Sequence, residues 1–451
     1  MKAFKSKKLF YKLESNPPLF FLTGYLLVIL LGGLLLSTPL AVQGSRAPSL
    51  VDPFFVATSA VCVTGLTPVV TCQQWSFFGQ VIIICLIQLG GLGIMTTVGA
   101  FGLAMDAQFG ISSRLLIKEE KGSASLDGMM KLTQFILILT FVIELGGALL
   151  LAIYFIPKFG FGEGIWYSIF HSISAFCNAG FDILSSSSLV PMNQEPWLLL
   201  VIAFLIISGG LGYVVYINIY NIRDHGRLSL HSRVVLLITG ILIVSGTLLI
   251  FLSEHDNPTT LGLMPLGKKW LNAFFQSVTT RTCGFTAIDQ SQLRGAGFSN
   301  TLALMFIGGA PSSTAGGIKV TTIAAVFLGT LAEIRSSGEA PIFHRNIAAA
   351  ALRKSFVIFF VALFWCLMVT YLLTLTEPAA DFKDLIFETV SAFGTVGLTR
   401  NLTPFLSGLG KIFIMMTMVF GKLGPIAILY ILVPKDTKKK NHLAEENVLI
   451  G

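Results

Sequence analysis

Four glycines of this chain, each in a short segment of similar composition, could allow the main chain to bind an ion. The segments read VTGL from position 63, NAGF from 178, TCGF from 282 and TVGL from 395. Their glycines are Gly65, Gly180, Gly284 and Gly397. Glycine adopts backbone angles that a Cβ disfavours, so main-chain carbonyl oxygens can point to one side with no side chain in the way. Oxygen atoms presented in this way are ligands for a hard cation.

An internal repeat places the four segments in register. The glycines are 115, 104 and 113 residues apart, and the residue ten positions before each of them is a phenylalanine. These phenylalanines are Phe55, Phe170, Phe274 and Phe387. Six positions before the glycine stand Ser59, Ser174 and Ser391, with Val278 as the exception. Such self-similarity indicates one structural unit written four times.

Four equivalent units most simply surround an axis, which would bring the four glycine turns together. A ring of main-chain carbonyls can then replace the water shell of a monovalent cation. Thr64, Thr282 and Thr395 can add hydroxyl oxygens, and Asn178 an amide. The candidate selectivity-filter residues are Cys62, Val63, Thr64, Gly65, Cys177, Asn178, Ala179, Gly180, Thr282, Cys283, Gly284, Thr395, Val396 and Gly397.

The elements that must position these turns are membrane spans. Apolar residues make up 54% of the chain and charged residues 12%, and the mean hydropathy is +0.79, which lies outside the range of soluble domains. Eight apolar runs reach the ~20 residues that a helix needs to cross a bilayer. We expect spans at 19–45, 76–105, 132–157, 196–222, 234–253, 298–332, 355–376 and 412–434.

The basic residues orient these spans. With the N-terminus inside, 20 of the 31 Lys and Arg residues fall in cytoplasmic segments, 9 in extracellular segments and 2 within spans. This asymmetry predicts a multi-pass protein of the plasma membrane with both termini in the cytoplasm. Topology then explains the net charge of +8, and no nucleic-acid partner is predicted.

Each pair of spans encloses a further apolar stretch that is too short to cross a bilayer as a helix. Each stretch ends in one of the glycine turns, so it predicts a short pore helix and a re-entrant loop that lines a cavity. The expected fold is an all-α polytopic membrane protein with four pseudo-symmetric repeats of span, pore helix with filter loop, and span around one central pore. The predicted divisions are 1–105 (N-terminal cytoplasmic segment and repeat one), 106–223 (repeat two), 224–335 (repeat three), 336–434 (repeat four) and 435–451 (cytoplasmic C-terminal tail).

Glycine clusters also recur in the second span of each repeat. They begin at Gly90, Gly209, Gly308 and Gly421, which lie 25, 29, 24 and 24 residues after the respective filter glycines. Glycines at this depth permit either close helix packing or a break in the helix. For the first two clusters both interpretations stay open.

The third cluster differs from the others, because it reads GGAPSSTAGG in the middle of a predicted span. Pro311 and four glycines disfavour a helix there, and the freed backbone groups must face water or protein. We predict an intramembrane loop at 308–317 that obstructs the pore on its cytoplasmic side, the alternative being a structural kink. The predicted gate residues are Gly308, Gly309, Ala310, Pro311, Ser312, Ser313, Thr314, Ala315, Gly316, Gly317, Lys319 and Lys422.

Three charged residues fall inside predicted spans, where a charge is costly unless it is paired or hydrated. Lys319 either belongs to the gate or reaches the cytoplasmic interface, and Lys422 occupies the corresponding place in repeat four. Glu144 is the one acidic residue inside a predicted span, and a structural ion pair is its expected state, with a helix end or a bound sodium ion as alternatives. The six cysteines form no CxxC pair, and we expect neither a metal site nor a disulfide.

The whole chain resembles the Trk/Ktr/HKT family of potassium transporters, and within it the bacterial Ktr membrane subunits. The segments that carry the resemblance are VTGL, LIQLGGLG, HSISAFCNAGF, SVTTRTCGF, FIGGAPSSTAGGIK and ETVSAFGTVGLT. The resemblance implies a potassium-channel-derived fold, a homodimer with one pore per subunit, a cytoplasmic ring of nucleotide-binding regulatory subunits of the KtrA type, and an intramembrane loop as gate. In that family a serine in the first filter goes with sodium preference, whereas this chain has Gly65. Lys422 stands where the family usually has arginine.

These observations predict the ion-conducting subunit of a potassium-uptake system in the lipid bilayer. Potassium is the expected transported ion, and sodium a stimulating or co-transported ion, with no bound cofactor. One alternative is a sodium or non-selective cation channel or transporter of the same superfamily. A secondary carrier with inverted repeats is disfavoured, because every unit here begins on the same side. An enzyme is not expected, because no polar catalytic cluster is present in the sequence.

Overall fold

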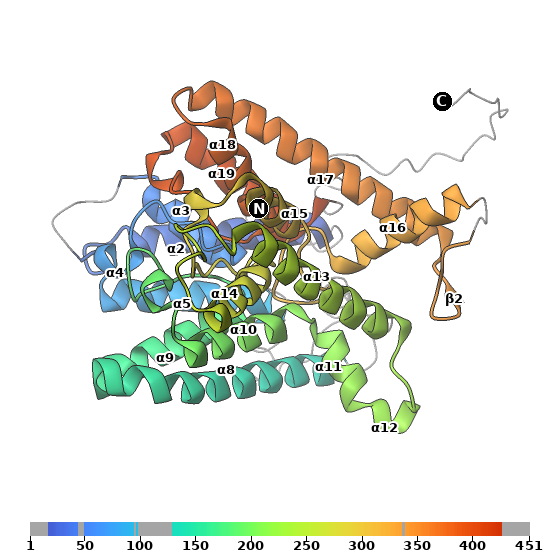
Figure 1. Ribbon diagram of the computed structural model, residues 1–451. Helices are drawn as coiled ribbons and strands as arrows, with labels where there is room; N and C mark the ends of the chain where they lie inside the picture. The colour runs from blue at the N-terminus through green and yellow to red at the C-terminus, as the bar shows by residue number, and fades with distance from the viewer. Residues whose placement is uncertain (1–16, 44–48, 94–95, 98–128, 336–338, 426–451) are drawn as a thin grey trace, which may run out of the picture.

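Residues 17–43, 49–93, 96–97, 129–335 and 339–425 are described in the computed structural model (Figure 1). Within them, four helices have the length and composition to cross a membrane. They are α2 (Pro17–Leu36), α8 (Met129–Phe159), α13 (Leu230–Glu254) and α17 (Ala349–Thr376). Each begins one of the predicted repeats. The predicted N-terminal cytoplasmic segment up to residue 16, most of the connection between repeats one and two, and the tail 435–451 lie outside the described residues.

A shorter helix follows each long helix and packs against it. These pore helices are α3 (Asp52–Cys62), α9 (Phe161–Phe176), α14 (Leu266–Thr279) and α18 (Phe382–Gly394). In repeats one, two and four, the phenylalanine ten positions before the glycine is fully buried. In repeat three the fully buried ring belongs to Phe275, whereas Phe274 is only partly buried. The sequence alignment is therefore one residue out of register in the third pore helix.

The second helix of repeats one, two and four ends one or two residues before the last glycine of its cluster. These helices are α5 (Phe77–Leu92), α10 (Pro196–Gly210) and α19 (Gly408–Leu423). The glycines that stop them, Gly93, Gly212 and Gly424, have φ angles of +88°, +83° and +86°. A positive φ cannot continue a right-handed helix, so each glycine is a stop.

Repeat two continues past this stop with α11 (Tyr213–Tyr220), which makes an angle of 88° with α10. The continuous span predicted at 196–222 is therefore wrong. Its composition is apolar throughout, but Gly212 turns the chain by nearly a right angle.

The second span predicted for repeat three is divided, as its proline and glycines indicate. Helix α15 (Gly295–Phe306) ends before the predicted loop, and helix α16 (Val320–Ile334) begins after it. Ile307 and Ile318 pair as an isolated parallel bridge at the neck of the loop. Segment 308–317 is thus a closed loop between two helices.

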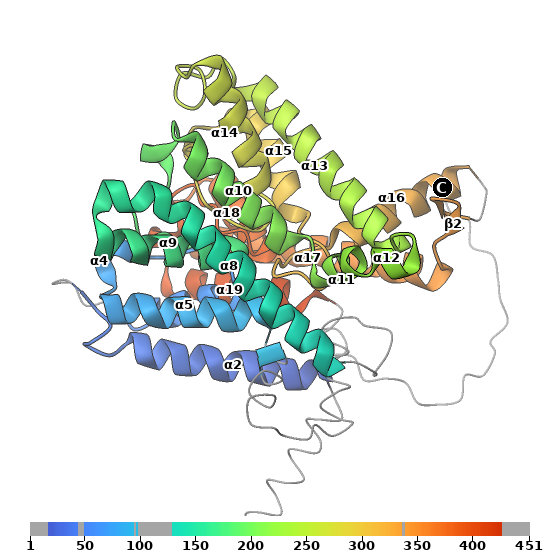
Figure 2. The same cartoon turned by 90° about the horizontal axis from the view of Figure 1, so that it is seen from below.

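Neighbouring units contact one another in a cycle. Helix α5 packs on α9, α10 on α14, α15 on α18, and α19 on α3. The last contact joins the fourth unit to the first, so the four units surround a common centre (Figures 1 and 2).

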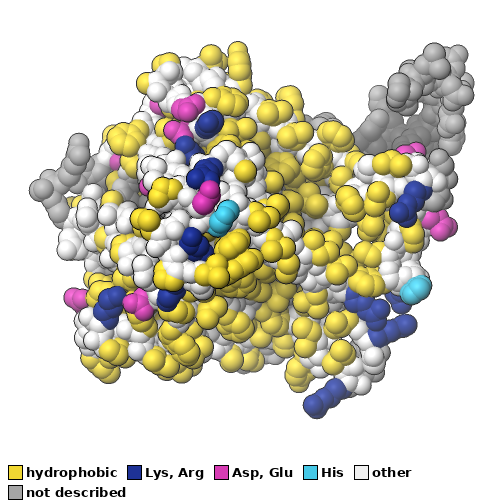
Figure 3. Space-filling model, viewed as in Figure 1, with side chains coloured by type: hydrophobic (Ala, Val, Ile, Leu, Met, Phe, Trp, Pro, Cys, Tyr) yellow, Lys and Arg dark blue, Asp and Glu magenta, His cyan; other side chains and the backbone are white. Residues whose placement is uncertain are grey.

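The remaining elements are short and lie in the connections. They are α4 (Thr71–Gln74), η1 (Val190–Met192), α12 (Ile222–His225), η2 (Gln290–Gln292), η3 (Thr403–Phe405) and an antiparallel pair, β1 (Pro341–Ile342) with β2 (Arg345–Asn346). Figure 3 shows that apolar side chains cover much of the face in view. Exposed leucine, isoleucine and phenylalanine side chains on α2, α8, α13 and α17 contribute to it, as expected for helices in contact with lipid.

Candidate ion-conduction site

The four glycines form a closed ring, which we call the filter ring. Each lies against the carbonyl oxygen of the residue that precedes another glycine of the ring. The pairs are Gly65 with Ala179, Gly180 with Cys283, Gly284 with Val396, and Gly397 with Thr64. A Cβ at any of these positions would overlap a backbone oxygen, so glycine is needed for the close approach. The pairing of Gly397 with Thr64 closes the ring between opposite ends of the chain.

The backbone of the ring repeats with the same strained geometry. The glycines have φ angles between +66° and +92°. Two positions earlier, each segment holds a non-glycine residue in the left-handed region: Val63 (57°), Asn178 (59°), Thr282 (76°) and Thr395 (49°). Such conformations cost ~1–3 kcal/mol each and persist only where the surroundings enforce them. Four occurrences in register indicate that one backbone shape is required in every repeat.

Hydroxyl side chains on the pore helices hold this backbone in place. The Ser59 hydroxyl accepts a hydrogen bond from the Gly65 amide (3.0 Å), and the Ser391 hydroxyl accepts one from the Gly397 amide (3.1 Å). The Ser174 hydroxyl instead donates to the carbonyl oxygen of Phe181 (2.8 Å). We call these side chains the filter braces.

The third repeat has its brace one position later. The Thr279 hydroxyl donates to the carbonyl oxygen of Phe285 (2.8 Å), as Ser174 does to Phe181 in repeat two. Val278 stands six positions before the ring glycine, where the other repeats have serine, but it is not the counterpart of these serines. The shift agrees with the buried Phe275, and both follow from a one-residue difference between the pore helix and the glycine.

The polar side chains predicted for the filter divide into two kinds. The Thr64, Thr282 and Thr395 hydroxyls are buried and have no hydrogen-bond partner among the described residues. The Asn178 amide nitrogen, in the orientation that satisfies its hydrogen bonds, donates to the carbonyl oxygens of Ala175 (3.0 Å) and Ile206 (3.1 Å). The Asn178 nitrogen therefore ties its segment to α10, whereas the threonine hydroxyls make no such contact among the described residues. Cys62, Cys177 and Cys283 are buried free thiols.

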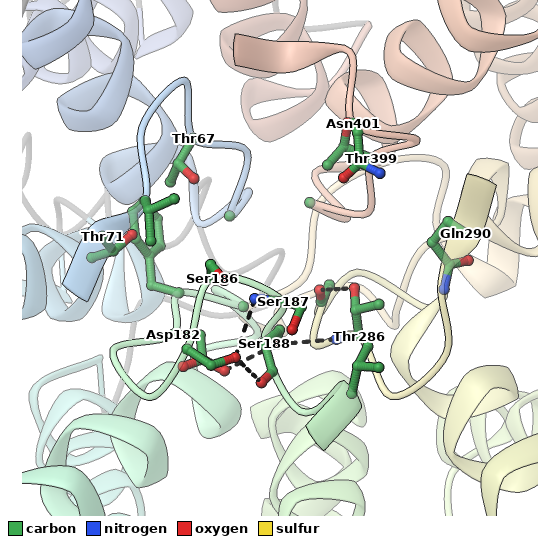
Figure 4. Close-up of a pocket in the computed structure, with 18 of the residues that line it drawn as sticks. Thr67, Thr71, Asp182, Ser186, Ser187, Ser188, Thr286, Gln290, Thr399 and Asn401 are labelled. Atoms are coloured by element: carbon green, nitrogen blue, oxygen red, sulfur yellow. Dashed lines mark hydrogen bonds between the residues drawn. The ribbon is translucent and has the colours of Figure 1, made fainter. Parts of the chain in front are cut away.

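A cavity of about 290 Å³ opens onto the ring, and all four ring glycines line it (Figure 4). Thr67, Asp182, Thr286 and Thr399, each two positions after a ring glycine, line it as well. Asp182 and Asp289 are its acidic residues, and none of the described residues that line it is Lys or Arg. The cavity therefore favours a cation. Sequence reasoning missed this second set, although GLT, GFD, GFT and GLT recur in step with the glycines.

The 308–317 loop is bound on two sides. Toward repeat two, the Ala310 amide donates to the Gly210 carbonyl oxygen (2.9 Å), and the Thr314 hydroxyl donates to that of Phe176 (3.3 Å). Toward repeat four, the Gly317 amide donates to the Gly421 carbonyl oxygen (3.3 Å). These partners belong to a pore-helix end and to second helices, so the loop crosses between two repeats.

The inner half of the loop lies directly against the filter. A Cβ at Gly316 would overlap the side chain of Thr395, which is one of the predicted filter threonines. Gly316 and Gly317 are buried, as are Gly308, Gly309 and Ala310, whereas Pro311, Ser312 and Ser313 are partly exposed. The loop thus fills the space next to the filter, on the side away from the cavity described above.

Both predicted gate lysines bind main-chain oxygens of this loop. Lys422 Nζ donates to the Thr314 carbonyl oxygen (2.7 Å), and Lys319 Nζ donates to that of Ala315 (2.5 Å). The two ammonium groups thus hold consecutive carbonyls. Lys319 therefore binds the 308–317 loop, and its role in a gate stays a prediction.

Glu144 on α8 has neutral partners. Its carboxylate accepts a hydrogen bond from the Gln88 amide (3.2 Å), and the Cys177 thiol lies 3.7 Å from its other oxygen. The ion pairs found in the described part of the chain do not include it. Among the described residues, the packing brings an amide on α5 and a thiol at the end of α9 to this carboxylate in place of the expected structural ion pair.

The glycine clusters serve both of the functions left open by the sequence. Gly90, Gly209 and Gly421 each lie against the carbonyl oxygen of the residue four positions before a ring glycine. Their close packing brings the second helices against the pore-helix ends. The last glycine of each cluster then ends the helix, as described above.

A buried ion pair between repeats was not foreseen. Lys411 on α19 lies 2.8 Å from Asp52 at the start of α3, and both side chains are about nine-tenths buried. Within repeat four, Arg400 binds Asp384 (2.6 Å) and also donates to the Gln290 carbonyl oxygen of repeat three (2.8 Å). The ion pair of Lys411 thus joins repeat four to repeat one, and the hydrogen bond of Arg400 joins it to repeat three.

Residues 2–440 match the profile of the TrkH family, described as cation transport proteins. This chain belongs to that family. Among curated relatives, it is 38% identical to the potassium/sodium uptake protein NtpJ of Enterococcus hirae, over 95% of this chain and 96% of the relative. It is 37% identical to the Ktr system potassium uptake protein B of Bacillus subtilis, over 92% of each chain.

The protein of that name from Vibrio alginolyticus is 36% identical over the full length of both chains. Among solved structures, the chain is similar to the potassium transporter TrkH from Vibrio parahaemolyticus. The TM-score is 0.69 at 17% sequence identity, over 91% of this chain and 85% of that one. At this identity the likeness concerns the fold, and it agrees with the predicted all-α, polytopic membrane architecture.

Proposed function

We propose that this member of the TrkH family is the ion-conducting subunit of a potassium-uptake system. The observation that carries the proposal is the filter ring, in which four glycine turns converge and open into a cavity whose described lining includes acidic residues and no Lys or Arg. Carbonyl oxygens of the ring would replace the hydration shell of a potassium ion. The names of the relatives from Bacillus and Vibrio, which refer to potassium uptake, support this assignment.

In this proposal the 308–317 loop is the gate. The loop lies on one side of the filter, while the cavity lies on the other, and the buried backbone of the loop would block a hydrated ion. Lys319 and Lys422 would stabilise the closed loop through its carbonyls and would also repel a cation below the filter. Opening would require these hydrogen bonds to break.

The proposal also includes the membrane location, the oligomeric state and the partners of the subunit. We retain the five predicted divisions of the chain, the plasma-membrane location with both termini in the cytoplasm, and the homodimer with one pore per subunit. The relatives' names refer to a Ktr system, which supports regulation by a partner, here a cytoplasmic ring of nucleotide-binding subunits of the KtrA type. Sodium would stimulate uptake or be co-transported. No catalytic activity is assigned.

Growth and uptake test the proposal. A bacterium that lacks its own potassium-uptake systems should grow at low potassium when it expresses this chain with cognate regulatory subunits. Rubidium uptake should follow, and it should rise when sodium is added. Failure to restore either growth or rubidium uptake, with the protein present in the membrane, would overturn the assignment.

A sodium or mixed-cation function is the second candidate. The Enterococcus hirae relative is named for potassium and sodium uptake, which favours this possibility. Competition separates the two candidates, because a potassium filter predicts that excess sodium does not displace rubidium. Equal inhibition of rubidium uptake by sodium and potassium would favour the mixed function.

A further inference from the structure

A second cavity, of about 1010 Å³, lies far from the filter, where α11, the start of α13 and the β1–β2 pair meet. Its lining has a distinct composition, since three of the ten described residues that line it are arginine and none of these ten is acidic. The lining residues are Asn218, Asn221, Arg227, Leu228, Ser229, Leu230, Arg233, Phe343, His344 and Arg345. We call it the basic cavity. It has no part in the conduction path described above.

Among the described residues, no carboxylate pairs with the arginines of the basic cavity. Arg227, Arg233 and Arg345 take part in none of the ion pairs found among the described residues. Helix α13 begins at the cavity with Ser229 as its N-cap, and the N-terminus of the helix adds partial positive charge. A cavity that gathers this much positive charge attracts an anion.

The border of the cavity is apolar. Phe343 lines it and is 40% exposed, while Ile219 and Tyr220 on the adjoining α11 are 45% and 76% exposed. On α13, Leu237 is 44% exposed, one turn beyond Arg233. Figure 3 shows blue side chains gathered at the end of the molecule that holds α12 and β2, next to the apolar surface of the helices. Positive charge at the edge of a lipid-facing surface is typical of the headgroup level of a membrane.

We propose that the basic cavity binds the headgroup of an anionic phospholipid. Guanidinium groups pair with phosphate through two parallel hydrogen bonds, and three of them suit a phosphodiester with further oxygens. The acyl chains would lie on Ile219, Tyr220 and Leu237. Free phosphate or a nucleotide would satisfy the arginines but would leave this apolar border without an occupant, so the lipid is favoured.

This inference rests on the proposed membrane orientation and not on the ion that is transported. The test uses the full-length protein, purified in a mild detergent and depleted of lipid. Native mass spectrometry measures the binding of phosphatidylglycerol and of phosphatidylcholine, with inorganic phosphate as competitor. Rubidium uptake by the same variants is measured separately, so a failed lipid test does not bear on the transport assignment.

The decisive variant is R227Q/R233Q/R345Q, and the matched control is R335Q/R353Q/K354Q. The control removes the same charge from exposed residues outside the basic cavity. A basic residue beside an anionic lipid surface contributes about fivefold in affinity, so the triple variant should lose roughly 100-fold for phosphatidylglycerol. Binding of phosphatidylcholine should not change, and the control should bind both lipids as the parent does.

Three results would overturn the proposal. The first is a preference for phosphatidylglycerol that stays within about twofold of the parent in the triple variant. The second is displacement of the lipid by inorganic phosphate, which would make the site one for a soluble anion. The third is unchanged lipid binding with lost binding of the regulatory subunits, which would make the arginines a protein contact.

Two further variants keep the test valid if the triple variant does not fold. Arg345→Gln alone changes an exposed residue of a two-residue strand, and it should weaken phosphatidylglycerol binding about fivefold. The triple lysine variant R227K/R233K/R345K keeps the charge but not the paired hydrogen bonds. It should bind between the parent and the glutamine variant, and binding as weak as that of the glutamine variant would contradict a role for charge.

Discussion

The filter ring and the 308–317 loop lie side by side, but the ring is formed by all four repeats and the loop by one. In the ring, each repeat contributes the same backbone shape, with a positive φ at the glycine and at the residue two positions earlier. The loop belongs to repeat three alone, and repeats two and four bind it through different groups. A fourfold arrangement suits an ion, which requires oxygen atoms on all sides. A single asymmetric segment suits a gate, because only one element has to move.

The supports of the two regions differ in the same way. The ring is held by four hydroxyl braces on the pore helices, whereas the loop is held by backbone hydrogen bonds, the Thr314 hydroxyl and two lysine side chains with many rotatable bonds. Substitutions in the ring should therefore change which ions are transported. Substitutions around the loop should change when the pore opens. Substitutions in the two regions test this division.

Gly397→Ala should reduce rubidium uptake by roughly 100-fold, because strain at a positive φ of +92° adds to overlap with the Thr64 carbonyl oxygen. Gly240→Ala is the matched control, since a Cβ at Gly240 on α13 meets nothing within 4 Å. The control should transport normally. Comparable uptake by the two variants would mean that the ring does not need glycine.

Lys422→Met should raise uptake in the absence of regulatory subunits by roughly tenfold. The substitution removes a charge-assisted hydrogen bond to the loop, which contributes ~1.5–3 kcal/mol to the closed state. Lys354→Met, on the exposed start of α17, is the control and should leave this basal uptake unchanged. A drop in basal uptake for Lys422→Met would show that the lysine does not hold the gate closed.

Gly65→Ser should lower the preference for potassium over sodium by about tenfold, because the added side chain displaces the Ala179 carbonyl oxygen from the ring. The measurement is inhibition of rubidium uptake by each ion. Basal uptake without regulatory subunits should not rise. An unchanged ion preference would place the selective ring elsewhere.

Ser391→Ala should change ion preference by about fivefold, since it removes one brace worth ~0.5–1.5 kcal/mol from one of four segments. Ser299→Ala, on the exposed side of α15, serves as the control. Thr279→Val should have a similar effect in repeat three, and Val278→Ala should not. The opposite ranking within repeat three would contradict the register shift.

Glu144→Gln should leave uptake within about twofold of the parent, because its partners are neutral and an amide of the same shape can keep hydrogen bonds to them. Sodium stimulation of rubidium uptake is the second measurement, and it too should persist. A loss of sodium stimulation would show that the negative charge binds an ion.

Most helices of this protein could be predicted from its amino-acid sequence. The four long helices follow from apolar length, the pore helices from apolar stretches too short to cross, and the break in repeat three from Pro311 with its glycines. The in-step glycines identified the segments that form the ring. All these features depend on local composition or on self-similarity, which are readable without coordinates.

The contacts between these elements could be read only from the folded structure. It closed the ring through Gly397 and Thr64, gave Glu144 an amide and a thiol as partners, and set the brace of repeat three at Thr279 instead of Val278. It also turned the apolar run 196–222 through 88° at Gly212. The physical reason is that these outcomes are set by contacts between distant segments. Local propensity permits several arrangements, and the packing of the four repeats selects one.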